Sequence, residues 1–82
     1  MNNSIDSLNY VLELLDNSIE QQQQNVDEWL SRVDFYEGEG WDDITEQARR
    51  ILQRSVTELN NLRRHKERLQ EVRDRMREGK AV

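Results

Sequence analysis

The sequence of 82 residues has no cysteine, no proline and a single histidine. Without cysteine the chain cannot form disulfides or a cysteine-based zinc module, and one histidine supplies too few ligands for another transition-metal site. We therefore expect neither a metal nor any other cofactor. A chain of this length buries only about 60% of the surface that its unfolded form exposes, so we expect oligomerisation to supply the missing stability.

Long apolar runs are absent as well. No stretch approaches the roughly 20 consecutive apolar residues of a transmembrane helix, and the first residues lack the basic and apolar segments of a signal peptide. We expect a cytoplasmic protein that makes no membrane contact.

The sequence also lacks the motifs of common catalytic sites. It contains no glycine-rich phosphate loop and no HExxH metal motif. His65 lies among Arg63, Arg64, Lys66 and Arg68, where a solvated surface residue is expected. We predict that the protein is not an enzyme.

What the sequence does contain is regular apolar spacing. Hydrophobic residues make up 34% of the chain and charged residues 35%, a balance typical of long helices and coiled coils. In the first half, one series of residues alternates steps of three and four, which predicts a helix packed along a narrow seam against a partner helix. The series is Ile5, Leu8, Leu12, Leu15, Ile19, Gln22, Val26, Trp29, Val33 and Tyr36. Gln22 should form a polar layer that fixes the register, within a helical run of four glutamines at 21–24 that could otherwise be a linker.

Two of the three glycines, Gly38 and Gly40, interrupt this pattern and predict a bend. We expect a single all-α domain over residues 1–82, with helices at 4–36 and 43–78 joined by a bend at 37–42. The helices should form an antiparallel, coiled-coil-like hairpin. Gly38 should adopt the left-handed conformation that ends the first helix, and Asp42 or Asp43 should cap the second.

The second helix continues the apolar pattern less regularly. Its apolar residues are Ile44, Ala48, Ile51, Leu52, Val56, Leu59, Leu62, Leu69, Val72 and Met76, while Lys66 and Arg73 take seam positions between them. Folding the chain about residue 39 places Gln22 near Ser55 and Leu12 beside Lys66. The predicted core and dimer seam comprises Leu8, Leu12, Leu15, Ile19, Val26, Trp29, Ile51, Leu52, Leu59 and Leu62.

Apolar residues also extend beyond the seam. Val11, Leu14 and Leu30 widen the apolar face of the first helix on both sides. A single antiparallel partner covers only a narrow stripe, so this width favours more than two helices. We expect a homodimer that forms a four-helix bundle.

Four of the five aromatic residues, Trp29, Phe35, Tyr36 and Trp41, lie near the bend. They are expected to close the end of the bundle as an aromatic plug, with Phe35 as the exposed member. The alternative is a binding hot spot, because Trp and Tyr dominate such sites. Five acids at the bend (Glu37, Glu39, Asp42, Asp43, Glu46) lack calcium-loop spacing, so we interpret them as capping and solubilising residues.

The sequence therefore favours a small protein–protein interaction module, an adaptor, chaperone or regulator that acts through amphipathic helix contacts with an unidentified protein. The predicted partner-binding residues are Phe35, Tyr36, Trp41, Leu69, Val72 and Met76.

Charge supplies two alternatives. Residues 1–40 carry nine acids and one base, whereas residues 41–82 carry eight acids and eleven bases, so the two halves attract each other when folded together. An acidic inhibitor, such as viruses and mobile elements encode, could fill a basic groove of an enzyme or mimic nucleic acid. Its acidic face would comprise Asp6, Glu13, Asp16, Glu20, Asp27, Glu28 and Asp34. Nucleic-acid binding through residues 63–77 is less favoured, because three acids dilute their seven bases.

A tryptophan at the bend between two long helices resembles the hairpin proteins of the type VII secretion WXG family. That motif requires glycine two residues after the tryptophan, and here Asp43 follows Trp41 at that distance. The resemblance therefore extends to size and architecture, and the motif itself is not present.

Overall fold

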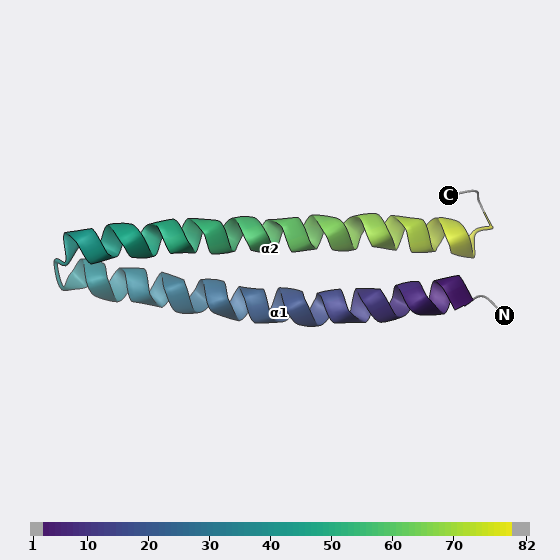
Figure 1. Ribbon diagram of the computed structural model, residues 1–82, viewed down its shortest axis with the longest axis horizontal. Helices are drawn as coiled ribbons and strands as arrows, with labels where there is room; N and C mark the ends of the chain where they lie inside the picture. Colours follow the sequence, from purple (N-terminus) through teal and green to yellow (C-terminus); the bar gives the residue numbers. More distant parts are fainter. Residues whose placement is uncertain (1–2, 80–82) are drawn as a thin grey trace.

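The computed structural model describes residues 3–79, which form two helices of 36 residues each: α1 (Asn3–Gly38) and α2 (Asp42–Arg77). The helices run antiparallel side by side, with both ends of the chain at one end of the molecule and the bend at the other (Figure 1). The all-α hairpin is confirmed. We call the two ends of the molecule the bend end and the open end.

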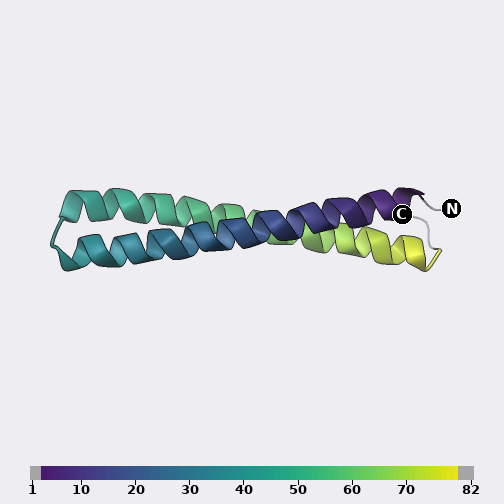
Figure 2. The same cartoon turned by 90° about the horizontal axis from the view of Figure 1, so that it is seen from below.

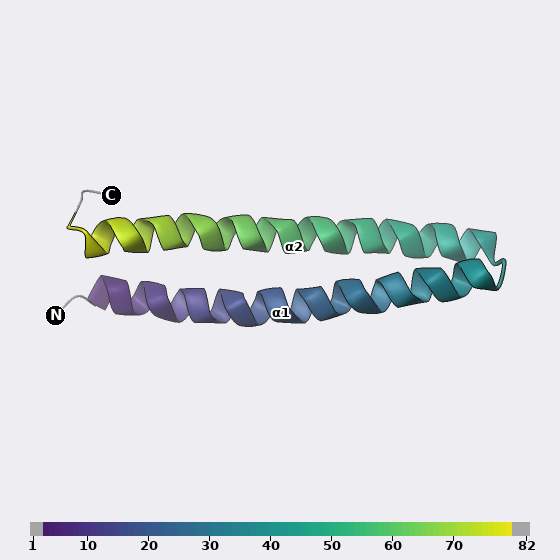
Figure 3. The same cartoon turned by 180° about the vertical axis from the view of Figure 1, so that it is seen from behind.

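The helices lie side by side over their whole length, which is visible from front and back (Figures 1 and 3). Seen from below, they cross at a shallow angle near the middle (Figure 2). This coiling follows from a seam that repeats every 3.5 residues, because a straight helix of 3.6 residues per turn would drift away from such a seam.

The core is a thin line of side chains between the helices. Leu12, Val26, Val33, Ala48 and Leu59 are its buried apolar members. The remaining predicted seam residues are half-buried: Leu8, Leu15, Ile19, Trp29, Ile51, Leu52 and Leu62. Within residues 3–79 no large side chain is completely enclosed, because two helices can cover each other on one side only.

The seam of α2 differs from the apolar series read from the sequence. Ile44 and Val56 are exposed, and the adjacent Thr45 and Ser55 are buried in their place. These small polar residues keep the alternating three–four spacing of the seam, and hydrogen bonds satisfy their hydroxyl groups. Thr45 Oγ1 donates to the Trp41 carbonyl at 2.8 Å, and Ser55 Oγ accepts from Asn25 Nδ2 at 3.4 Å.

The predicted polar layer is present. Gln22 Nε2 donates to the main-chain carbonyl of Ser55 at 2.9 Å, and the glutamine run lies within α1 rather than in a linker. The turn centres on residue 40, midway between Gly38 and Asp42, one residue later than the sequence predicts. Lys66 consequently forms an ion pair with Asp16, one helical turn beyond the predicted neighbour Leu12.

A Schellman motif ends α1. The Gly40 N–H donates to the Glu37 carbonyl and the Trp41 N–H to the Tyr36 carbonyl, both at 3.1 Å. Gly40 supplies the positive φ of 75° that this motif requires, whereas Gly38 is the last residue of the helix. The prediction that Gly38 adopts the left-handed conformation is therefore wrong, because the helix includes Gly38 and the left-handed residue comes two positions later, at Gly40.

α2 begins immediately after this motif. Trp41 is its N-cap residue and makes no side-chain capping bond, so the predicted cap at Asp42 or Asp43 is also wrong. Both aspartates instead lie in the first turn, where their charge suits the positive end of the helix dipole. At the other end, Gly79 has a φ of 73° and follows the last helical turn. The sequence predicts fraying of the last three residues, but residues 80–82 lie outside the described residues.

The two bend glycines should respond oppositely to alanine. Gly40→Ala forces a Cβ into the left-handed region and should lower the free energy of unfolding by about 1–2 kcal/mol. Gly38→Ala should raise it by about 0.5–1 kcal/mol, because alanine is the better helix former. Neither Cβ would meet an atom within 4 Å, so packing does not confound the pair. Urea unfolding followed by circular dichroism measures both; equal effects would contradict the assigned turn.

Arg73 marks a weak layer in the seam. Its side chain is only 23% exposed, its Nε is buried without a hydrogen-bond partner, and its contact with Asp74 is long at 3.5 Å. Arg73→Leu should raise the free energy of unfolding by about 1 kcal/mol, because it removes an unsatisfied buried donor. The exposed neighbour provides the control, since Arg75→Leu should change stability by less than about 0.5 kcal/mol. Chemical denaturation distinguishes the two, and a loss of stability in Arg73→Leu would refute this account.

Candidate functional site

The seam divides the hairpin surface into two flanks of different chemistry. On one flank, polar pairs join the helices: Glu37 with Arg49 at 2.8 Å, Gln23 with Arg63 at 2.8 Å, and Asp16 with Lys66. We call this side the polar flank. Its pairs are exposed, so each adds little stability, and the exposed Leu30 and Val56 lie between them.

The opposite side is the apolar flank. Near the open end it holds an open groove of about 500 Å³, lined by Ser4, Ser7, Leu8, Val11, Val72 and Met76. Leu14 lies one helical turn beyond Val11 and is 46% exposed. Exposed apolar side chains around a groove are typical of a protein-interaction surface.

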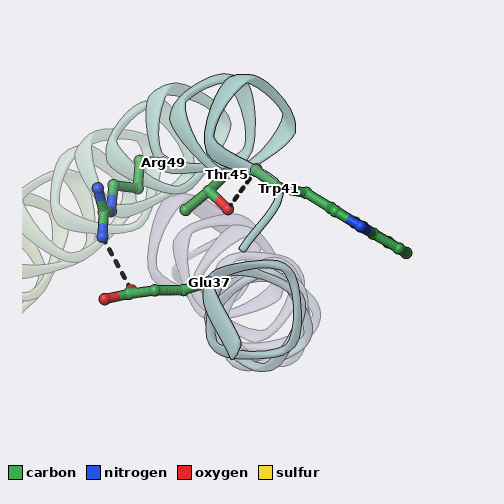
Figure 4. A network of polar contacts seen from close by, with 4 residues as sticks. All are labelled: Glu37, Trp41, Thr45 and Arg49. Atoms are coloured by element: carbon green, nitrogen blue, oxygen red, sulfur yellow. Dashed lines mark hydrogen bonds and ion pairs between the residues drawn. The ribbon is translucent and has the colours of Figure 1, made fainter. Parts of the chain in front are cut away.

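The aromatic cluster occupies the bend end of the same flank. Phe35, Tyr36 and Trp41 contact one another with ring centroids 5.9–6.1 Å apart, and Ile44 lies beside Trp41. Figure 4 shows the Glu37–Arg49 pair on one side of the bend and the Trp41 side chain projecting from the other. Each end of the apolar flank therefore carries its own apolar patch.

The cluster is not a plug. Phe35 is 57% exposed, as predicted, but Trp41 is also 46% exposed, and only Tyr36 is half-buried. Trp29 does not join them, because it lies two turns earlier and packs its ring against the Arg32 guanidinium, 4.5 Å from the centroid. The plug interpretation is wrong because the rings pack on the outside of the last turn of α1.

The Schellman motif explains this placement. In such motifs the residue after the left-handed glycine packs on side chains three or four positions inside the helix end. Trp41 is that residue, and Tyr36 and Phe35 are its partners, with centroids 6.1 and 6.0 Å away. The backbone of the bend therefore holds Trp41 against α1 and leaves much of its ring in solvent.

The second predicted group of partner-binding residues lies at the open end, away from the aromatic cluster. Val72 and Met76 line the groove, whereas Leu69 is half-buried and does not line it. Sequence reasoning missed Ile44 as a member of the apolar flank. Heptad spacing contained the signal, because Ile44, Ile51 and Val72 lie seven or a multiple of seven residues apart.

The predicted acidic face also has a definite geometry. Five of its carboxylates recur every seven residues on α1 and all are exposed: Asp6, Glu13, Glu20, Asp27 and Asp34. The other two members pair with bases of the same chain, Asp16 with Lys66 and Glu28 with Arg32. The five form a stripe that borders the polar flank, because they occupy one heptad position on that side of the seam.

The basic segment 63–77 is partly engaged within the chain. Arg63 donates to Gln23, Lys66 pairs with Asp16, and Arg73 lies in the seam. Three of its seven bases are thus committed to holding the hairpin together, which weakens the case for a phosphate-binding surface.

Within residues 3–79, no three His, Asp or Glu side chains are grouped so that they could hold a metal ion. Over the same part of the chain, neither helix has a stretch long and apolar enough to cross a membrane. The candidate site is therefore the apolar flank with the aromatic cluster at its bend end. No protein-family model, no curated protein and no solved structure matches the chain.

Proposed function

We propose that the protein is a non-enzymatic protein–protein interaction module, of the adaptor, chaperone or regulator kind, that binds its partner through the aromatic cluster. The observation that carries this proposal is the pair Phe35 and Trp41, whose rings pack edge to face at 6.0 Å while both remain largely exposed. A folded bend already fixes these rings, so binding would cost little conformational entropy. Large, rigid aromatic residues of this kind supply most of the energy at protein interfaces.

The charge around the cluster indicates the chemistry of the partner. Asp42 and Asp43 line the same hollow as Trp41 and Ile44, and no lysine or arginine occurs between residues 33 and 48. A partner segment that places basic residues around an apolar anchor would match this surface, and the complementary charge would speed association. An amphipathic helix with a basic polar face meets both requirements. The cysteine-free sequence suits the reducing cytoplasm, where we place this activity.

The acidic stripe supports a second candidate. Its carboxylates lie about 10 Å apart along α1, since seven residues rise 1.5 Å each. An array of this kind could occupy a basic groove of a target enzyme, as an acidic inhibitor does. The same stripe disfavours the remaining alternative, nucleic-acid binding, because it would repel phosphates.

Trp41→Ala should weaken the partner complex at least tenfold. A tagged chain is incubated with a lysate of its native host, washed at ~500 mM salt, where surface charge contacts are largely screened, and the retained proteins are identified by mass spectrometry. Tyr10→Ala is the matched control, because Tyr10 is an exposed aromatic residue on α1 outside the cluster. A partner retained by Trp41→Ala, or lost equally from both variants, would contradict the proposal.

Charge variants separate the alternatives. The combined variant Glu13→Gln, Glu20→Gln and Asp27→Asn should leave the complex intact if the aromatic cluster binds the partner. Loss of the complex in this variant alone would instead favour the acidic inhibitor. Retention of the protein on DNA or RNA at ~150 mM salt, falling steeply as salt rises, would favour nucleic-acid binding.

A further inference from the structure

We propose that the apolar flank binds a second copy of this chain, with a two-fold axis parallel to the length of the hairpin. The two bends then lie side by side, and α1 of each copy packs on α2 of the other. This inference rests on the proposed function, because it treats the chain as a module that binds proteins by packing helices. It identifies a second copy of the chain as one partner of that module.

Area is the first support. The hairpin measures 60 × 17 × 12 Å, so its broad face offers roughly 1000 Å² per copy. Stable protein interfaces bury about 800 Å² on each partner, so one flank is large enough for a stable dimer. A foreign peptide in the open-end groove alone would leave Phe35 and Ile44 at the bend end uncovered.

The second support is a match between the two rows of side chains along the apolar flank. Each row combines two series of residues spaced seven apart. On α1 these are Val11, Ser18, Asn25 and Arg32, and Leu14, Gln21, Glu28 and Phe35; on α2 they are Ile44, Ile51, Glu58, His65 and Val72, and Gln47, Arg54, Asn61 and Arg68. With the turn centred on residue 40, positions at about equal distances from the bend meet across the proposed interface.

At the bend end, at the open end and in the middle the chemistry agrees, whereas Leu14 meets Arg68 of the second copy. Near the bend Phe35 meets Ile44 of the second copy, and at the open end Val11 meets Val72, so apolar residues cover each other. In the middle Gln21 meets Asn61, which lets two amides exchange hydrogen bonds.

Charged groups on the two copies are complementary as well. Between the middle and the bend, Glu28 meets Arg54 of the second copy, which brings opposite charges together. At the level of whole helices, an α1 that carries most of the acids faces an α2 that carries most of the bases. The exposed acidic stripe stays outside this interface, because it borders the polar flank.

In the other face-to-face arrangement the two-fold axis is perpendicular to the length of the hairpin, so the bend of one copy lies over the open end of the other. This arrangement fits poorly. Each row would then face its own reversed copy, so Glu58, near the middle of α2, would approach Glu58 of the second copy. Like charges in contact oppose binding.

Light scattering on the full chain tests the dimer. The mass should be twice 9.9 kDa, and Val11→Glu should reduce it to that of a monomer while far-ultraviolet circular dichroism still shows two helices. Val56→Glu is the matched control, because Val56 is a valine with 38% exposure, against 41% for Val11, but lies on the polar flank. A monomeric parent protein, or equal effects of the two variants, would overturn the dimer.

Spin labels test the orientation, since the chain has no native cysteine to block. A nitroxide on Glu39→Cys marks the bend and one on Arg77→Cys the open end. Each variant should give an inter-copy distance within roughly 30 Å, because packed helices lie 8–10 Å apart. Distances near the 60 Å length of the hairpin at both positions would overturn the side-by-side bends.

These tests are independent of the proposed function. Trp41→Ala should keep the dimer mass while losing the partner. If the unmodified protein is a monomer and the Trp41→Ala variant fails to retain the partner, this inference alone is overturned, and the apolar flank is assigned to a different chain. If the protein is a dimer and the Trp41→Ala variant still retains the partner, the proposed function alone is overturned.

Discussion

A seam that repeats every 3.5 residues is the constraint on which the rest of this molecule depends. It fixes the shallow coil of the two helices and confines burial to one line of side chains, from Leu12 to Val33 on α1 and from Thr45 to Leu59 on α2. Because only one partner helix is present, every apolar residue beside that line remains exposed. The two flanks, and the difference between them, follow from this geometry.

Much of this architecture could be predicted from the sequence. The regular spacing in α1 was sufficient to identify the hairpin and the layer that joins Gln22 to Ser55. The seam of α2 was harder, because Ile44 and Val56 are more apolar than the buried residues beside them. Hydrophobicity favoured the larger side chains, whereas packing selected Thr45 and Ser55. The Thr45 hydroxyl bonds within its own helix turn, and the Ser55 hydroxyl bonds across the seam to Asn25.

The candidate site was less predictable, and the reason is local geometry. Whether Trp41 is enclosed or exposed depends on which glycine adopts positive φ, and two glycines lie within three residues. Placing the turn at Gly40 makes Trp41 pack on Tyr36 and Phe35 from outside. Spacing alone could not separate this outcome from a closed plug, because both interpretations use the same residues.

Together, the proposals assign a role to each flank. The polar flank holds the helices in register, with the acidic stripe at its border in solvent, while the apolar flank binds the second copy. In the side-by-side dimer Phe35 packs on Ile44 of the second copy, and the two Trp41 side chains lie at the same end of a four-helix bundle. A partner with two apolar anchors could then engage both tryptophans, and its second contact would benefit from a high effective concentration.

The central claim is that one hairpin does not complete its own core, so folding and association are linked. Thermal unfolding of the full chain over a hundredfold range of concentration tests this most directly, because the stability of a dimer depends on the concentration of its protomers. The account predicts a midpoint that rises steadily with concentration. A midpoint that stays constant over this range would show that the lone hairpin is a complete folding unit and would contradict the claim.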